Sequence, residues 1–190
     1  MDTLRTAFEG CGAVIFCASA SKKGGTAEKV DFEGVVNTAK ACVGLKVPRL
    51  IVISRQVSFP DSIGYKVTNI FGNIMTYKRE GEVALEQVYA GAPKGIAFTI
   101  IRPGGLTDGP AKGMELNQGD TIGGTISRAD LAEVAVEAAL SEAAEDTAFE
   151  VFDGSTRGPL QKNFPVVSGY EHKADNYPGL FDGLKTDIGL

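Results

Sequence analysis

Hydroxyl groups, a cation and paired glycines follow three short apolar runs of the sequence. The runs AVIFCA, PRLIVIS and IAFTIIRP lead into Ser19, Ser54 and Gly104, respectively. Serine hydroxyls offer hydrogen bonds, and small residues leave room for a bound molecule to approach the backbone. This pattern predicts a cofactor or ligand site at the ends of the runs. The alternative is structural, because turns after strands are often small and polar in any case.

Four apolar runs of strand length alternate with amphipathic segments. The expected strands span 13–18, 48–54, 96–103 and 147–154, and helical spacing marks 2–10, 30–45, 72–90 and 127–143. Continuous apolar strands separated by amphipathic helices predict an α/β fold, in which helices cover both faces of a parallel sheet. Ligands of such sheets bind beyond the carboxyl ends of the strands, so Ser19, Ser54 and Gly104 are expected at one edge.

Three further features complete the organisation expected from the sequence. Ser127 is placed to cap the last helix, with Asp130 in its first turn. The stretch between 103 and 127 is expected to be a loop. Residues 155–190 are rich in Gly, Pro and Asp, and they predict an irregular arm that packs on the domain or on a partner.

Composition sets limits on the function. The 190 residues predict one soluble domain, and a net charge of −5 argues against nucleic acid as the main partner. No apolar run is long enough to cross a bilayer, and the first ten residues do not resemble a signal peptide. Three cysteines without a CxxC pattern and a single histidine argue against disulfides and against a metal site. A cytoplasmic or organellar protein is expected, the plastid stroma included.

Six blocks of the sequence stand in the order of a known family. They are AFEGCGAVIFCAS, VDFEGVVNTAKAC, VPRLIVIS, YKREGE, FTIIRPGGL and ISRADLAEVAVEAAL. Together they resemble an atypical short-chain dehydrogenase/reductase of the NmrA-like, NAD(P)-binding type, over roughly residues 1–153. The resemblance implies a Rossmann-like, doubly wound sheet over residues 1–154, a bound NADP or NAD, and the irregular arm over 155–190.

The resemblance also implies roles for individual residues. Lys78 would reach the nicotinamide ribose and Ser54 would lie near the nicotinamide, so these two are the implied catalytic residues. The segment Cys17-Ala18-Ser19 would border the adenosine, and the turn after the third strand would wrap the nicotinamide end. The implied cofactor-binding residues are Cys17, Ala18, Ser19, Ser54, Lys78, Pro103, Gly104, Gly105 and Leu106.

The chain departs from the family pattern at its start. Members open with a strand, a glycine-rich loop that binds pyrophosphate at a helix N-terminus, a helix and two more strands. No such motif occurs here, and KKGGT (22–26) follows the wrong strand and is interpreted as a solvated loop. About sixty or seventy family residues are missing, by the length of such a half-domain. The chain is therefore interpreted as a fragment or as a shortened relative.

The second departure concerns the proton donor. Typical members have a tyrosine four residues before the lysine, whose ammonium group lowers the phenol pKa. Here Ile74 occupies that position, and the adjacent Tyr77 is rotated by roughly 100° around the helix. Tyr65 lies in a loop and is a weaker candidate. Some atypical relatives without the tyrosine reduce quinones, which need little protein acid, and others bind a nucleotide without turnover.

Several of these residues also have purely structural interpretations. In the structural interpretation, Lys78 and Glu82 are only an i, i+4 pair on the helix surface. Arg102 is likewise interpreted as the partner of a salt bridge to a neighbouring helix. Cys17 and Cys42 are interpreted as small core side chains.

Three functions remain open from the sequence. The first is a NAD(P)-dependent reductase of a small carbonyl or quinone compound. The second is a nucleotide-sensing binding protein. The third is an accessory subunit of a respiratory or photosynthetic complex, in which a protein partner covers the sheet edge left by the missing strands and contacts the C-terminal arm.

Overall fold

The expected apolar runs become the central strands of one sheet. The computed structural model describes residues 2–21, 24–56, 69, 72–109, 114–156, 158–159, 170–174 and 179–186. Its helices are α1 (Asp2–Phe8), the π-helix η1 (Glu28–Gly34), α2 (Val35–Leu45), α4 (Ile74–Tyr89), α5 (Arg128–Leu140), and the 3-10 turns η2 (Glu142–Ala144) and η3 (Gly154–Thr156). Its strands are β1 (Ala13–Phe16), β2 (Arg49–Ile53), β3 (Ala97–Pro103), β4 (Gly105–Thr107), β5 (Met114–Gln118), β6 (Ile122–Gly123), β7 (Thr125–Ser127), β8 (Thr147–Asp153), β9 (Gly158–Pro159) and β10 (Tyr170–Ala174).

The main sheet has six strands in the order β1-β2-β3-β8-β5-β10. The first four strands run parallel, as the alternation of apolar runs and helices predicted. β5 joins β8 antiparallel, and β10 joins β5 antiparallel. The carboxyl ends of β1, β2 and β3 therefore point in one direction, which places a candidate ligand edge on the described part of the molecule.

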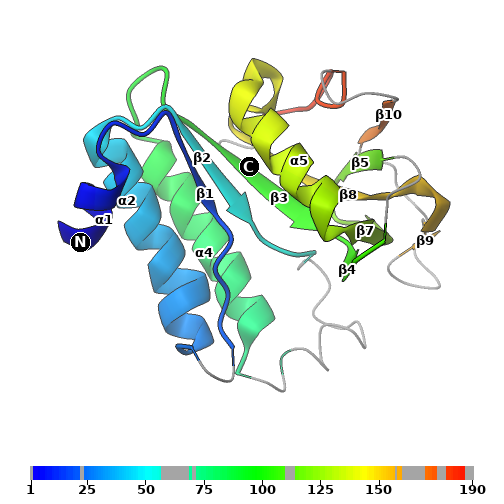
Figure 1. Ribbon diagram of the computed structural model, residues 1–190, viewed down its shortest axis with the longest axis horizontal. Coiled ribbons are helices and arrows are strands. Elements are labelled where there is room, and N and C mark those ends of the chain that lie inside the picture. Colours follow the sequence, from blue (N-terminus) through cyan, green and yellow to red (C-terminus); the bar gives the residue numbers. More distant parts are fainter. Residues whose placement is uncertain are drawn as a thin grey trace.

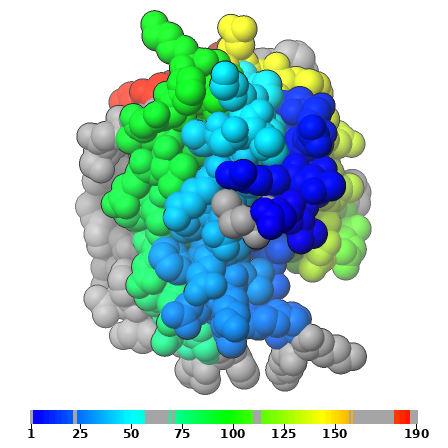
Figure 2. All heavy atoms as spheres, turned by 90° about the vertical axis from the view of Figure 1, so that its left-hand side faces the viewer, coloured from blue at the N-terminus to red at the C-terminus, as the bar shows by residue number. Residues whose placement is uncertain are grey.

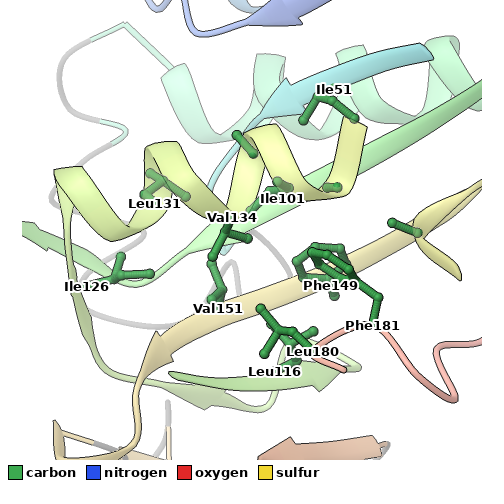
Figure 3. Close-up of a cluster of buried hydrophobic side chains, with 13 residues drawn as sticks. Ile51, Ile101, Leu116, Ile126, Leu131, Val134, Phe149, Val151, Leu180 and Phe181 are labelled. Carbon is green, nitrogen blue, oxygen red and sulfur yellow. The ribbon is translucent and has the colours of Figure 1, made fainter. Parts of the chain in front are cut away.

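Helices cover both faces of the sheet (Figure 1). Figure 2 shows α1, α2 and α4 side by side on one face. Beneath them, Leu50, Val52, Phe98 and Ile100 of the strands pack against apolar side chains of α2 and α4. On the other face, Ile51, Ile101, Phe149 and Val151 pack under α5 (Figure 3). Alternate residues of β2 and β3 are thus buried in two different hydrophobic cores, one on each face of the sheet. This explains why the sequences of these strands are continuously apolar.

Parts of the C-terminal region complete the second core. Leu180 and Phe181 are fully buried, and the ring of Phe181 lies 5.7 Å from the ring of Phe149 (Figure 3). β10 extends the sheet beside β5, and β9 pairs with β6. The described segments of residues 155–190 therefore pack on the chain's own domain.

The sequence signals at helix ends agree with the structure. The Ser127 hydroxyl accepts a hydrogen bond of 3.0 Å from the backbone N–H of Asp130, and this confirms Ser127 as the N-cap of α5. Gly10, which follows α1, has a φ of 76°, a backbone conformation that favours glycine.

Two expectations about secondary structure need correction. The predicted loop between 103 and 127 carries the short strands β4, β5, β6 and β7, because β5 fills the sheet position beside β8. The predicted helix over 30–45 begins as a π-helix and becomes α-helical only at Val35.

β1 is the outer strand of the described sheet, so its far edge has no neighbouring strand there. Ile15 on this strand is 38% exposed, and Cys17, which follows it, is exposed. The interpretation of Cys17 as a core side chain is wrong, because no described element covers the strand on that side; Cys42 is buried as expected. Within the described residues, no helix has both the length and the apolar character needed to cross a membrane.

Candidate functional site

A buried ion pair lies beside the end of β1. Nζ of Lys78, on α4, is 2.7 Å from Oδ1 of Asp31, on η1. The Asp31 side chain is fully buried and that of Lys78 nearly so. Desolvation makes such a pair costly unless the carboxylate receives further hydrogen bonds. Lys78 therefore does not form the expected surface pair with Glu82.

The loop after β1 supplies those hydrogen bonds. The Ser19 hydroxyl donates to Oδ1 of Asp31 at 2.8 Å, and the backbone N–H of Ala20 donates to Oδ2 at 3.0 Å. One carboxylate thus holds the ammonium group of Lys78 and fixes the path of the chain beyond β1. In Figure 1, this loop and the beginnings of η1 and α4 lie at the same end of the sheet.

A glycine in α4 permits this close approach. Gly81 stands three residues after Lys78, and a Cβ atom built on it would overlap the carbonyl oxygen of Asp31. Residues three apart share a helix face, so Gly81 and Lys78 both face η1. η1 is a π-helical segment, a form that is rare and frequent at functional sites. Asp31 lies in that segment.

Ser54, at the end of β2, contributes a buried hydroxyl group. Ser54 is 8% exposed, and its Oγ has no hydrogen-bond partner among the described residues. Ser54, Asp31 and Lys78 line one small cavity, hereafter the Ser54 cavity, of about 10 Å³, which is room for about one water molecule. Buried hydroxyl groups are normally hydrogen-bonded, so a water molecule or a ligand atom in the Ser54 cavity could complete the bonding of the Ser54 Oγ.

The donor set of this cluster fits the ribose and carboxamide of a nicotinamide nucleotide. The Ser54 hydroxyl can donate or accept, and the Lys78 ammonium group has N–H groups beyond the one directed at Asp31. Both suit hydroxyl and carbonyl oxygens. The Ser54 cavity itself is too small for a ring, so the nucleotide would lie against its mouth.

A second polar network begins one turn further along α4. Glu82 also lines the Ser54 cavity and accepts hydrogen bonds from Nε and Nη2 of Arg102 at 3.3 and 3.0 Å. Nη1 of Arg102 lies 3.4 Å from Oε1 of Glu150 on β8. Arg102 therefore forms the salt bridge to a helix that its structural interpretation predicted, and it ties α4 to the centre of the sheet.

Burial changes the proton affinity of this network. Burial raises the pKa of Glu150 to about 8, and the nearby Asp120 adds to the rise, while Arg102 opposes it. Burial alone would lower the pKa of Arg102, but Glu82 and Glu150 reverse the effect and raise it. Arg102 is accordingly a fixed cation, and Glu150 is a carboxyl group whose pKa is raised by its burial in this network.

The structure separates the expected cofactor residues into two groups. Ser19, Ser54 and Lys78 meet around Asp31 and the Ser54 cavity. Pro103, Gly104, Gly105 and Leu106 do not line that cavity. Cys17 and Ala18 are exposed next to Ser19.

Gly104 is explained within the described chain by packing. A Cβ atom on Gly104 would overlap the carbonyl oxygen of Gly124, and that oxygen accepts a 2.8 Å hydrogen bond from Gly105 N–H. Leu106, in β4, is 43% exposed, and β4 pairs with β7. The close contact with Gly124 thus accounts for Gly104, and the role of this turn toward a nucleotide stays a prediction.

Asp31 is the site residue that the sequence analysis missed. The stretch VDFEGVV contains two acidic residues, and the sequence alone does not distinguish the buried Asp31 from the exposed Glu33. Tyr77 does not occupy the position of the family's proton donor, but it lines an open pocket together with Ile74, which lies one turn earlier on α4. Tyr65 and KKGGT lysines Lys22 and Lys23 lie outside the described residues.

Residues 1–142 match the protein family described as NAD(P)H-binding. The chain belongs to this NAD(P)H-binding family. An uncharacterized chloroplastic protein of Arabidopsis thaliana is 32% identical over 182 residues, which cover 90% of this chain and 58% of that relative. The chain thus spans little more than half the length of this relative.

Solved structures of low sequence identity confirm the Rossmann-like fold of this NAD(P)H-binding protein. The oxidoreductase ylbE of Lactococcus lactis matches with a TM-score of 0.67 at 20% identity, covering 82% of this chain and 68% of that one. A short-chain dehydrogenase/reductase of Veillonella parvula in complex with NADP matches with a TM-score of 0.59 at 14% identity, covering 86% and 72%.

Proposed function

We propose that the cluster of Ser19, Asp31, Ser54 and Lys78 binds the nicotinamide end of NADP or NAD, and that the protein reduces a small carbonyl or quinone compound. The observation that carries this proposal is the buried Ser54 hydroxyl, which has no hydrogen-bond partner in the described part of the chain and shares a cavity with Lys78. Both groups lie where the carboxyl ends of parallel strands receive ligands. The family match supports the cofactor class.

Each residue has a distinct task in this proposal. Lys78 donates hydrogen bonds to ribose hydroxyls, and Asp31 holds its ammonium group in place. Ser19 and the backbone of Ala20 keep the Asp31 carboxylate fixed. Ser54 donates its hydroxyl hydrogen toward the substrate oxygen or the carboxamide. A residue held by several partners needs no reorganisation when the reaction occurs.

The reaction transfers two electrons. When bound, the reduced nicotinamide supplies a hydride, and the substrate takes up one further proton at oxygen, so a quinone becomes a hydroquinone. Ile74 cannot donate that proton, although it stands four residues before Lys78. A quinone suits such a site, because its reduced oxygen is stable enough to take the proton from water or from Ser54.

A non-catalytic role is the second candidate, and it is favoured by the edge of β1 that no strand of the described sheet pairs with. Exposed Ile15 and Cys17 lie on or beside that edge. In this alternative the domain binds a nucleotide without turnover, and a protein partner covers the edge as part of a larger assembly. The chloroplastic relative supports a plastid location for either role.

Reduced-nicotinamide oxidation in the presence of a quinone distinguishes the two roles. The full chain is mixed with NADPH or NADH and duroquinone, and the loss of reduced-nicotinamide absorbance is followed. The reductase proposal predicts turnover that falls at least tenfold in Ser54→Ala and is unchanged in Ser155→Ala, which lies in η3. Tight binding of the dinucleotide without any turnover would replace the reductase with the non-catalytic role, and absence of binding would overturn both.

A further inference from the structure

An open pocket lies beside the proposed nucleotide site, between the loop after β1 and the start of α4. It has a volume of about 670 Å³, within the range of small-molecule sites. Ala20 and Ser21 form one wall, and Ile74 and Tyr77 form another. We call this space the Tyr77 pocket.

The Tyr77 pocket shares its walls with the Lys78 cluster. Ala20 lines the pocket, while its backbone N–H bonds to Asp31. Tyr77 lines the pocket, and the next residue, Lys78, forms the ion pair with Asp31. A molecule in the pocket would therefore lie next to the cluster that we assign to the nicotinamide end.

Small residues and one aliphatic side chain make much of the pocket apolar. Gly25, Ala27 and Gly72 leave the space open, and Ile74 presents a hydrocarbon surface. Ile74 and Tyr77 are three residues apart in α4, so they face the same side of the helix. An aromatic ring and an aliphatic chain at this spacing suit a flat, apolar ligand.

Three polar side chains of the pocket have no polar partner among the residues that the structure describes. Within the described parts of the chain, the side chains of Glu28, Asn73 and Tyr77 make no hydrogen bond or ion pair. Asn73 has a φ of 57°, in the left-handed region, and follows Gly72 with a φ of 96°. This turn places Asn73 in the lining of the pocket, which also contains Tyr77.

The charge of the side chains that line the pocket favours neutral ligands over anionic ones. Glu28 is the charged side chain among the described lining residues, and it is acidic. A carboxylate at the rim repels an anionic ligand, and the repulsion weakens as salt is added. The phenol of Tyr77 and the amide of Asn73 can donate to carbonyl oxygens.

We infer that the Tyr77 pocket is the substrate site and that it takes uncharged, flat, largely apolar carbonyl compounds, while Glu28 excludes anionic ones. Tyr77 and Asn73 donate hydrogen bonds to the substrate carbonyl, and Ile74 contacts its hydrocarbon part. This inference rests on the proposed function for its link to catalysis, but the pocket binds its ligand independently of the nucleotide.

The test compares a neutral and an anionic ligand of the same shape. Hydroxymethyl-anthraquinone and anthraquinone sulfonate are titrated into the full chain by calorimetry, at low ionic strength and without nucleotide. These rings do not alkylate Cys17. We expect the neutral compound to bind at least fivefold more tightly, as one unit charge near Glu28 is worth about 1 kcal/mol, or about fivefold.

Three variants locate the effect. Glu28→Gln is expected to increase the affinity for the sulfonate several-fold and to leave the affinity for the neutral compound unchanged. Glu33→Gln, an exposed acidic residue of η1 outside the pocket lining, is the matched control and should change neither. Tyr77→Phe should weaken the binding of the neutral compound roughly three- to tenfold, because the substitution removes one hydrogen-bond donor.

The outcomes separate this inference from the proposed function. Equal binding of the two compounds, or no binding of either, would overturn the pocket assignment, and so would Glu28 and Tyr77 variants that behave like wild type. NADPH is titrated separately into the same protein preparations. If quinone binding shows the expected selection while NADPH does not bind, the proposed function fails and the pocket assignment stands.

Discussion

The ammonium group of Lys78 lies 2.7 Å from Oδ1 of Asp31, and this buried ion pair joins α4 to η1 beside the end of β1. The pair sets the geometry of the whole candidate site. Asp31 also fixes the loop after β1, through Ser19 and Ala20, and Lys78 borders the Ser54 cavity. The predictions below test the contacts that place these groups.

Gly81 is predicted to be required for the approach of α4 to η1. Gly81→Ala adds a Cβ atom that would overlap the Asp31 carbonyl oxygen, and we expect a loss of about 1–3 kcal/mol in the free energy of unfolding. NADPH affinity should fall as well, because Lys78 and Asp31 move apart. Chemical denaturation and NADPH fluorescence measure the two effects.

Gly44→Ala is the matched control for Gly81. Gly44 lies in α2 with open space around its Cα, so alanine there should stabilise the helix by up to about 1 kcal/mol. If Gly81→Ala were as stable as wild type and bound NADPH equally well, the close contact of α4 with η1 would not matter for the site.

Ser54 is predicted to serve ligand binding at the expense of stability. Ser54→Ala removes a buried hydroxyl that has no hydrogen-bond partner among the described residues, so the free energy of unfolding should stay the same or rise slightly. NADPH binding or turnover should nevertheless weaken at least tenfold. Ser127→Ala is the opposite case, because loss of the α5 cap should cost about 1 kcal/mol without affecting the ligand. A Ser54→Ala protein that unfolds more easily and binds normally would contradict this assignment.

Glu150 is predicted to make the protein less stable as the pH rises. Its pKa is about 8 in the folded protein against an ordinary value of 4.5, so the folded state binds more protons than the unfolded state between these values. The contribution to stability is therefore fully present below about pH 4.5 and is lost as the pH rises toward about 8. Denaturation curves measured across this range give the slope.

Glu150→Gln isolates this contribution, because glutamine keeps the size and cannot titrate. The variant should show a smaller fall in stability between about pH 5 and about pH 8, whereas the exposed Glu133→Gln on α5 should follow wild type. An unchanged slope in Glu150→Gln would show that another group carries the pH dependence.

Local patterns in the sequence predicted the frame of the fold. β2, β3 and β8 lie within the expected runs because their residues are buried on both faces, and Ser127 caps α5 as its side-chain chemistry indicates. The strands β4, β5, β6 and β7 were not predicted, since they are short and lie in a glycine-rich stretch. The pairing of β5 and β6 depends on β8 and β9, which lie far away along the chain.

The site was predictable only in part for the same reason. Ser54 and Lys78 follow from a strand end and from the family resemblance. Asp31 becomes visible only when η1, α4 and the loop after β1 meet around it, with Gly81 allowing the contact. The role of Tyr77 in a pocket likewise depends on where the loop after β1 runs.

The central claim is that a nicotinamide dinucleotide binds through Lys78 and Asp31. Removing one charge alone would leave its partner buried and unpaired, which destabilises a protein by about 3–5 kcal/mol. The double variant Asp31→Asn/Lys78→Met removes both charges, and Lys40→Met on the exposed side of α2 is the control. Titration of NADPH, followed by its fluorescence, measures binding in each protein. We predict that the folded double variant binds at least tenfold more weakly than wild type and Lys40→Met; equal binding by all three would contradict the account.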